Sequence, residues 1–182
     1  DINPSLIQEA TTLTEKMKLD NVQLLCCKNV GFDEIKKKLG DKKYDLVYIL
    51  EVMEHVGDSG KTMYDDKKKL LIEISKLIDK NGTIVISVPK MVGFSYLIQR
   101  MGIIMLGLGR EPMPFQDFMK SVFLRDNSAL EHKWWNGGRM GFNYLKLEKQ
   151  FAPEFEIVKK SNLFFQAVYM IKRKWWGLRI KN

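Results

Sequence analysis

The sequence predicts an α/β protein built on a doubly wound, mostly parallel sheet with an antiparallel hairpin at its carboxyl-terminal end. Two apolar runs without polar alternation, residues 44–50 and 83–88, are typical of strands that are buried on both faces of a parallel sheet. Helical and strand patterns alternate through the first half of the chain, which indicates crossover connections between parallel strands. The last two strand patterns lie close enough in sequence to pair as a hairpin.

The amino-terminal part contains clear helix and strand patterns. Residues 4–18 are expected to form a helix, because a proline suits the first helical turn and apolar residues then recur at helical spacing. A strand is expected at residues 22–27, and a short helix at residues 32–39 ends at Gly40. The apolar run at residues 44–50 follows as a buried strand.

The middle of the chain continues the alternation. A helix is expected at residues 67–78, where leucine and isoleucine repeat with helical periodicity. A turn at residues 79–82 then leads into the apolar strand 83–88, which Pro89 ends. The carboxyl-terminal elements are a helix at residues 144–151 and strands at residues 156–160 and 164–172.

Composition limits the kinds of protein that this chain can be. Its 182 residues are 45% apolar and 11% aromatic, which is enough to build a sizeable core. The formal net charge of +8 suits either a lysine-rich solvated surface or an anionic partner. Cys26 and Cys27 fit core packing in a reducing compartment, and the start at Asp1 shows no signal-peptide pattern, so we expect a cytoplasmic protein.

Ionisable side chains cluster directly after the first buried strand. The run Glu51-Val52-Met53-Glu54-His55 follows Leu50, and ligands of open α/β sheets bind outside the carboxyl ends of the strands. If these residues begin a helical turn, Glu51, Glu54 and His55 lie on one face. Two carboxylates and an imidazole suit a divalent cation or acid–base chemistry.

Three segments together resemble the class I S-adenosylmethionine-dependent methyltransferases. They are DINPSLIQEA at residues 1–10, YDLV at residue 44 running into EVMEHV at residue 51, and LIDKNGTIVISVP at residue 77. The carboxyl-terminal hairpin agrees with this resemblance, and the ubiquinone-pathway O-methyltransferases carry a similar Glu-x-x-Glu-His element. The resemblance implies a Rossmann-like fold and methyl transfer from S-adenosylmethionine to an oxygen, or with less support a nitrogen, of a small or lipid-like acceptor.

The resemblance also implies positions for the cofactor contacts. Asp1 stands where the family places an acid that accepts hydrogen bonds from both ribose hydroxyls, and Ile2 would pack on the adenine. Many members place an aspartate where this chain has Lys28 and Asn29, and of these only Asn29 can accept a hydrogen bond from the adenine amino group. Leu50 and Glu51 fall beside the methionine part of the cofactor.

A divalent metal such as Mg²⁺ is one interpretation of the Glu-x-x-Glu-His element. Small-RNA 2'-O-methyltransferases use a similar set, completed by a histidine from a later segment. This chain has two histidines, His55 and His132, and the resemblance therefore implies a metal held by Glu51, Glu54, His55 and His132. Many family members carry a Glu-His-Val element without a metal, and in that case His132 or His55 is the candidate general base.

The glycine-rich turn that follows the first strand of this family is not found in the chain. The glycine clusters at residues 107–109 and 137–141 do not follow a predicted strand. We therefore expect that the amino-terminal strands of the sheet, about 50 residues for a strand–helix–strand unit, belong to a longer protein. A strand supplied by a partner and an inactive domain retained for interaction are the alternatives.

The segment between Pro89 and Tyr144 is expected to form a substrate lid. Its first part, residues 92–109, is apolar but contains glutamine, arginine and glycines, so we expect an amphipathic lid helix or a helix in a membrane interface rather than a membrane span. The basic and aromatic residues of the carboxyl-terminal tail fit either contact with a membrane or packing over the core. Nucleic acid ranks third, because no known binding module organises these residues.

Four regions are expected. They are a cofactor-binding part of the core at residues 1–90, the lid at 91–143, the carboxyl-terminal helix and hairpin at 144–174, and the tail at 175–182.

Overall fold

A computed structural model describes most of the protein. The described residues are 3–25, 32–57, 63–107, 113–131, 134–135, 138–139 and 141–174. They form two compact units, Asp1–Lys43 and Tyr44–Asn182.

The first unit contains two of the expected helices, α1 (Pro4–Lys16) and α2 (Phe32–Leu39). The side chain of Asn3 caps α1 by accepting a hydrogen bond from the backbone N–H of Ser5. The strand expected at residues 22–27 is wrong for residues 22–25, which have no regular structure, while residues 26 and 27 lie outside the described residues. Residues 22–25 belong to neither of the described sheets, and a strand pattern becomes a strand only where it joins a ladder.

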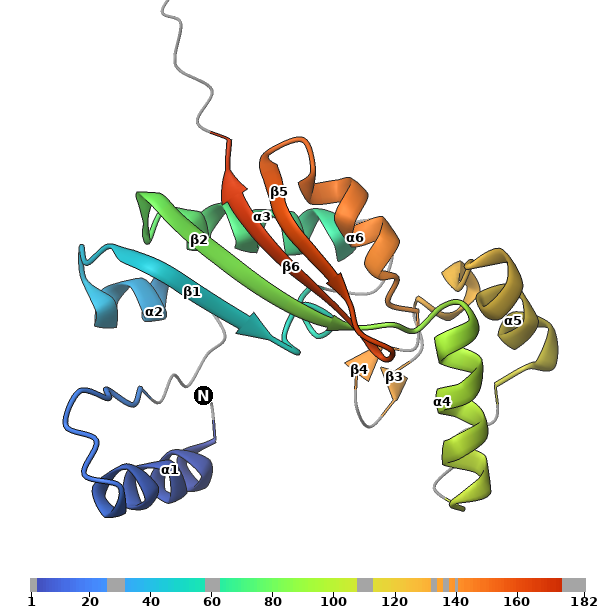
Figure 1. The fold of residues 1–182 in the computed structure, drawn as a ribbon, viewed down its shortest axis with the longest axis horizontal. Coiled ribbons are helices and arrows are strands. Elements are labelled where there is room, and N and C mark those ends of the chain that lie inside the picture. Colours follow the sequence, from blue (N-terminus) through green and yellow to red (C-terminus); the bar gives the residue numbers. More distant parts are fainter. Residues whose placement is uncertain are drawn as a thin grey trace, which may run out of the picture. The chain divides into compact units, whose positions relative to one another are not determined.

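The second unit is organised around a four-stranded sheet in its described part (Figure 1). The strands are β1 (Tyr44–Leu50), β2 (Ile78–Pro89), β5 (Phe155–Asn162) and β6 (Gln166–Arg173). Their order is β1-β2-β6-β5, with β1 parallel to β2 and with β6 antiparallel to both of its neighbours. This arrangement confirms the α/β fold with a parallel pair and an antiparallel hairpin at the carboxyl-terminal edge.

Two elements differ most from their predicted bounds. The helix expected at residues 67–78 is α3, Met63–Ser75, which begins a turn earlier with Asp65 and Asp66 near its positive end. The turn expected at residues 79–82 lies inside β2, which begins at Ile78. Ile78 pairs with Tyr44 and the register then shifts, so these residues form an irregularity in the strand instead of a connection.

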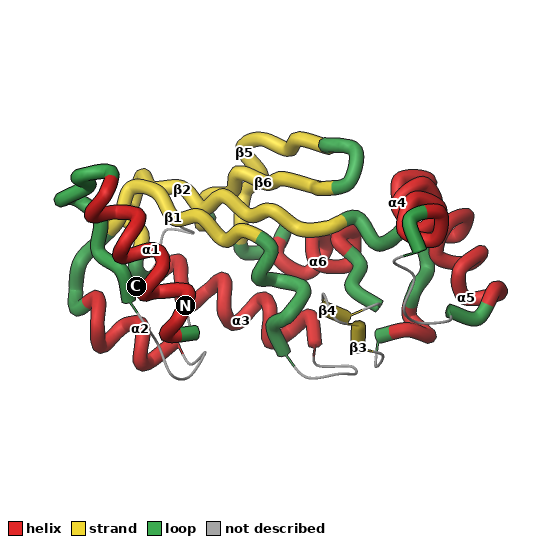
Figure 2. The backbone as a smooth tube through the Cα atoms, turned by 90° about the horizontal axis from the view of Figure 1, so that it is seen from below, coloured by secondary structure: helices red, strands yellow, loops and turns green. Residues whose placement is uncertain are grey.

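The core lies between the sheet and two helices, α3 and α6 (Tyr144–Phe151), which cover the same face of the sheet (Figure 2). The ring of Phe151 is at its centre. It meets the rings of Tyr169 and Phe155 edge-on, with centroid distances of 5.5 Å and 6.5 Å. Helix α6 matches its predicted bounds, because its apolar residues have a clear helical spacing.

The expectation that β1 is buried on both faces is wrong. Ile49 is only 5% exposed, whereas Tyr48 is 61% and Leu50 is 56% exposed. The side chains of a strand alternate between faces, and Ile49 points to the face that α3 and α6 cover. β1 is also the edge strand of the described sheet. Its apolar composition therefore reveals that it is a strand but not how much of it is covered.

The segment between β2 and α6 consists of short elements. They are α4 (Phe94–Met105), α5 (Phe115–Met119), a π-helical turn (Lys120–Leu124), a 3₁₀ turn (Ser128–Leu130), β3 (Trp134–Trp135) and β4 (Gly138–Arg139). Within the described ranges, every helix falls short of the length and apolar content that a bilayer crossing requires. The four regional boundaries expected from the sequence stay predictions.

Candidate functional site

The candidate site begins where β1 and β2 end side by side. Leu50 is paired with Ser87 in the parallel ladder, so the two strands deliver their carboxyl ends to the same edge of the sheet. The chain then leaves β1 through the acidic segment that starts at Glu51. This is the edge at which open α/β sheets bind their ligands.

Ser87 holds Glu51 through both its backbone and its side chain. The backbone N–H of Glu51 donates to the carbonyl oxygen of Ser87 at 3.2 Å, and the hydroxyl of Ser87 donates to Oε1 of Glu51 at 2.8 Å. The backbone of Glu51 has φ of 52°, a left-handed conformation that costs a non-glycine residue about 1–2 kcal/mol. These two contacts offset that cost and fix the point at which the chain turns away from the sheet.

The left-handed residue also corrects the expected geometry of the motif. A helical turn starting at Glu51 would have placed Glu51, Glu54 and His55 on one face, but a positive φ interrupts that helical path. Glu51 contacts Ser87, Glu54 is buried at 2% exposure, and the side chain of His55 is 46% exposed. The three side chains therefore occupy different environments.

Glu54 is a buried carboxyl group at this turn. Its Oε1 lies 3.7 Å from Nε2 of His55, and its Oε2 has no hydrogen-bond partner among the described residues. The pKa of Glu54 is raised to about 7, chiefly by burial and in smaller part by the neighbouring Glu51 carboxylate, against the lowering effects of a backbone hydrogen bond and the charge of Lys67. This carboxyl therefore changes its charge near neutral pH.

Lys67 of α3 is a buried cation behind the same turn, and the sequence prediction did not place it in the core. Its Nζ donates to the carbonyl oxygen of Val56 at 2.5 Å and lies 5.6 Å from the centre of the Phe142 ring. The signal was present in the helical spacing, because Lys67 stands between Met63 and Leu71 on the buried stripe of α3. A run of three lysines concealed it by resembling a solvated face.

Asn143 connects the end of the segment between β2 and α6 to this part of the core. Its backbone N–H donates to the hydroxyl of Tyr64 on α3 at 2.9 Å, and its side-chain amide donates to the carbonyl oxygen of Arg125 at 2.9 Å. Its Oδ1 caps α6 by accepting from the backbone N–H of Leu145. Burial raises the pKa of Tyr64, so the phenol stays neutral and available as an acceptor.

The predicted metal site is not supported. Among the residues that the structure describes, no three or more histidine, cysteine, aspartate or glutamate side chains are grouped so that they could hold a metal ion. Glu51 is directed to Ser87 and the His55 side chain is about half exposed, and these orientations explain why the motif does not converge. His132, the fourth proposed ligand, lies outside the described residues.

The other predicted site residues divide into two groups. Leu50 and Glu51 lie at the tip of β1, where the cofactor-binding prediction placed them. The remaining predicted cofactor contacts, Asp1, Ile2, Lys28 and Asn29, lie outside the described residues. The cofactor-binding roles of all six residues stay predictions.

Replacing Ser87 with alanine is expected to lower the free energy of unfolding by about 1–2 kcal/mol, because a hydrogen bond to a charged acceptor is lost while Glu51 remains in a left-handed conformation. Urea denaturation measures this change. Glu51→Gln keeps an acceptor for the Ser87 hydroxyl and is the matched control, with an expected loss below that of Ser87→Ala. Equal stability of Ser87→Ala and the wild type would show that the contact does not support the turn.

The comparison with family models identifies one family. Residues 1–102, more than half of the chain, match the family described as a methyltransferase domain. A comparison with curated proteins gives no match.

Solved structures with the same fold include three that cover nearly the whole chain. The PH0226 protein from Pyrococcus horikoshii OT3 has a TM-score of 0.58 and 12% identity over 96% of this chain and 69% of its own. An S-adenosylmethionine-dependent methyltransferase from Clostridium acetobutylicum ATCC 824 has a TM-score of 0.55 and 11% identity, over 95% of this chain and 73% of its own. PKMT2 from Rickettsia typhi in complex with AdoHcy has a TM-score of 0.53 and 14% identity, over 95% of this chain and 43% of its own.

The chain therefore belongs to the methyltransferase-domain family, and its fold is that of the class I S-adenosylmethionine-dependent enzymes. The matched residues include α1, β1, the turn at Glu51 and β2, so they contain the described part of the candidate site.

Proposed function

We propose that this protein transfers the methyl group of S-adenosylmethionine to an oxygen of a small or lipid-like acceptor, with the cofactor bound at the carboxyl ends of β1 and β2. The observation that carries the proposal is the family match over residues 1–102, which includes the strand ends and the turn that Ser87 holds. The pairing of Leu50 with Ser87 brings both strand ends to the edge of the sheet where this fold binds nucleosides.

The proposed cofactor contacts are those that the family resemblance implies. Asp1 accepts hydrogen bonds from the ribose hydroxyls, since its two carboxylate oxygens match a pair of neighbouring donors. Ile2 packs on the adenine, and Asn29 accepts from the adenine amino group. Leu50 and Glu51 line the methionine part, where the exposed Leu50 offers an apolar surface.

In this reaction the methyl group passes directly from the cofactor to the acceptor. The acceptor oxygen attacks the sulfonium methyl in line, the carbon–sulfur bond breaks, and the thioether product leaves with both electrons of that bond. Alignment of the two reactants and exclusion of water supply much of the rate. The proton of the acceptor hydroxyl passes to a general base, for which His132 and the exposed His55 are the candidates.

Titration calorimetry with S-adenosylhomocysteine tests the proposal on the complete protein. Binding is expected, and Asp1→Ala is expected to weaken it about 10- to 100-fold, because a carboxylate that accepts hydrogen bonds contributes roughly 1.5–3 kcal/mol. Asp20→Ala removes an exposed acid from the same unit and is the matched control, with unchanged affinity expected. An absence of binding would favour a domain that has lost its cofactor and is retained for interaction.

A further inference from the structure

The exposed side of α4 is apolar along its whole length. Phe94, Ile98, Met101 and Met105 follow one another at helical spacing, and all are exposed, with Phe94 at 67% and Met105 at 83%. Ile104 beside them is also exposed. Every exposed side chain of α4 is therefore a large hydrophobic one, which is unusual for a helix that faces water.

The charged residue of α4 is buried instead of facing solvent. Arg100 is the one charged residue of α4, and it is only 6% exposed. It shares the inward side with Tyr96, whose ring lies 6.1 Å from that of Phe118 on α5. Charge inside and apolar residues outside is the reverse of the pattern on a solvated helix.

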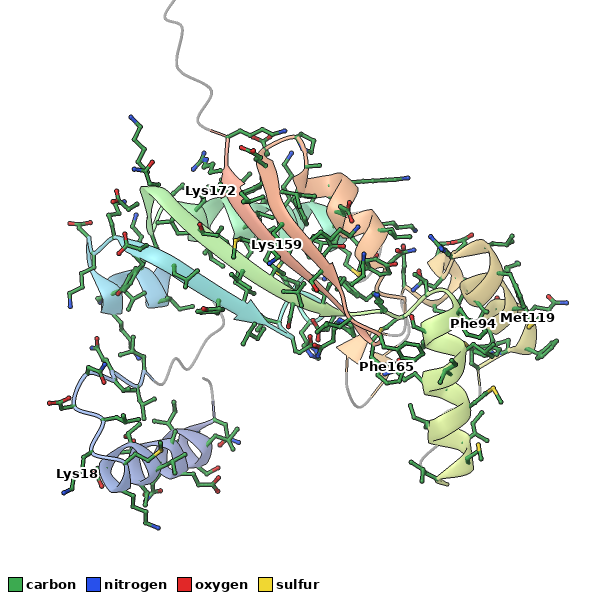
Figure 3. The ribbon with its side chains drawn as sticks, in the orientation of Figure 1. Lys18, Phe94, Met119, Lys159, Phe165 and Lys172 are labelled. Carbon is green, nitrogen blue, oxygen red and sulfur yellow. The ribbon has the colours of Figure 1, made fainter. Side chains whose placement is uncertain are left out.

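The tip of the β5–β6 hairpin adds three exposed apolar residues near the start of α4. Pro89 pairs with Gln166, and the backbone N–H of Lys90 donates to the carbonyl oxygen of Phe165 at 2.9 Å, so the tip adjoins the chain that leads into α4. The exposed residues of the tip are Leu163, Phe164 and Phe165. Figure 3 shows Phe165 and Phe94 at the same end of the sheet. We refer to the five exposed α4 residues and this tip as the α4 surface.

Two cations stand next to the α4 surface. Nζ of Lys90 donates to the carbonyl oxygen of Leu163 at 2.6 Å, and Nε of Arg125 lies 3.8 Å from the position that a Cβ on Gly93 would take. Asp126, the acid next to Arg125 in sequence, accepts a hydrogen bond from the backbone N–H of Ser128. Apolar side chains beside cations match the boundary between acyl chains and anionic headgroups.

We propose that the α4 surface docks on an anionic lipid bilayer, with α4 lying in the interface. A helix in this position needs no membrane-spanning length, because only its apolar side enters the acyl region. The net charge of +8 adds attraction to an anionic leaflet. A bilayer explains why the whole exposed side lacks a polar residue, whereas the rim of a protein interface is normally polar.

Docking places the segment after β2 at the bilayer, and β2 also ends at the candidate site. A lipid-like acceptor could then enter from the membrane without crossing water. This consequence for the acceptor rests on the proposed function. The docking itself does not, because it involves no cofactor contact.

Vesicle flotation tests the docking with the complete protein. Phosphatidylcholine vesicles that contain phosphatidylserine are expected to carry the wild type to the lipid fraction, and pure phosphatidylcholine vesicles are expected to carry much less. The double variant Met101→Asp, Met105→Asp is expected to bind the anionic vesicles at least about tenfold more weakly than the wild type. Val158→Asp changes an exposed apolar residue of β5 outside the α4 surface and is the control, with unchanged flotation expected.

Several results would overturn the docking. They are a wild type that does not float, a double variant that floats as well as the wild type, and equal binding to vesicles with and without phosphatidylserine. Sedimentation in which the double variant turns a wild-type dimer into a monomer, without flotation of either, would assign the surface to a second copy of the chain. Calorimetry with S-adenosylhomocysteine on the double variant separates the two proposals, because unchanged cofactor affinity shows that only the lipid contact was lost.

Discussion

Glu54→Gln is expected to make the protein more stable than the wild type at pH 8 by about 3 kcal/mol, and to leave its stability near pH 4 almost unchanged. Burial raises the pKa of Glu54 from 4.5 to about 7. Each unit of such a shift corresponds to about 1.4 kcal/mol. Glutamine resembles the protonated carboxyl and does not titrate, so the difference between the two proteins isolates this one group.

The sign follows from the direction of the pKa shift. The folded protein holds the Glu54 proton more tightly than the unfolded chain, so between pH 4.5 and about 7 the folded state binds more protons. Folding stability therefore falls as the pH rises through this window, and the full cost is present above it. Below pH 4.5 both states are protonated and the cost disappears.

Urea denaturation at pH values from 4 to 8 measures the difference between Glu54→Gln and the wild type. Glu73→Gln on the same helix as Lys67 is the control, because Glu73 forms an exposed pair with Lys76 and is expected to matter by less than about 0.5 kcal/mol at any of these pH values. Two denaturation series that run parallel across the whole pH range would show that Glu54 is not a buried group that titrates near neutrality.

The elements that were predicted with correct bounds are those whose pattern is local. The apolar run of β1 and the helical spacing of α2 and α6 are each contained within a dozen residues, and they need no knowledge of the rest of the fold. The predicted start of β2 was wrong, because the true start depends on pairing with β1. Residues 79–82 have the composition of a turn, but the pairing of Ile78 with Tyr44 includes them in the strand.

The same distinction between local patterns and features that depend on distant residues applies to the site. The sequence placed the acidic motif correctly at the end of β1, because that position follows from the order of strands. It could not reveal that Ser87 holds Glu51, since these two residues are 36 positions apart and meet only through the parallel ladder. It also could not reveal that Glu54 is buried while His55 is exposed, because a left-handed residue at position 51 breaks the helical spacing on which that inference rested.

Gly141→Ala is expected to destabilise the protein by about 3 kcal/mol or more. A Cβ at this position would lie 2.2 Å from the backbone N and Cα of Glu131 and 2.5 Å from the carbonyl carbon of Leu130. These contacts are with backbone, which cannot rotate away as the end of a side chain can, so the segment around Leu130 must shift. Overpacking of a core costs roughly 1–3 kcal/mol and occasionally more, and contacts this close belong at the upper end.

The position matters because the residues that follow Gly141 join the segment between β2 and α6 to the core. Phe142 is fully buried and Asn143 bonds both to Tyr64 of α3 and to Arg125. Gly102→Ala is the matched control, because Gly102 lies within α4 with no atom within 4 Å of the added methyl group, and alanine there is expected to stabilise by about 0.5–1 kcal/mol. Urea denaturation compares the two variants. A Gly141→Ala protein as stable as the wild type would mean that the chain at residues 130–131 can move aside, and that the segment between β2 and α6 is not anchored to the core at this point.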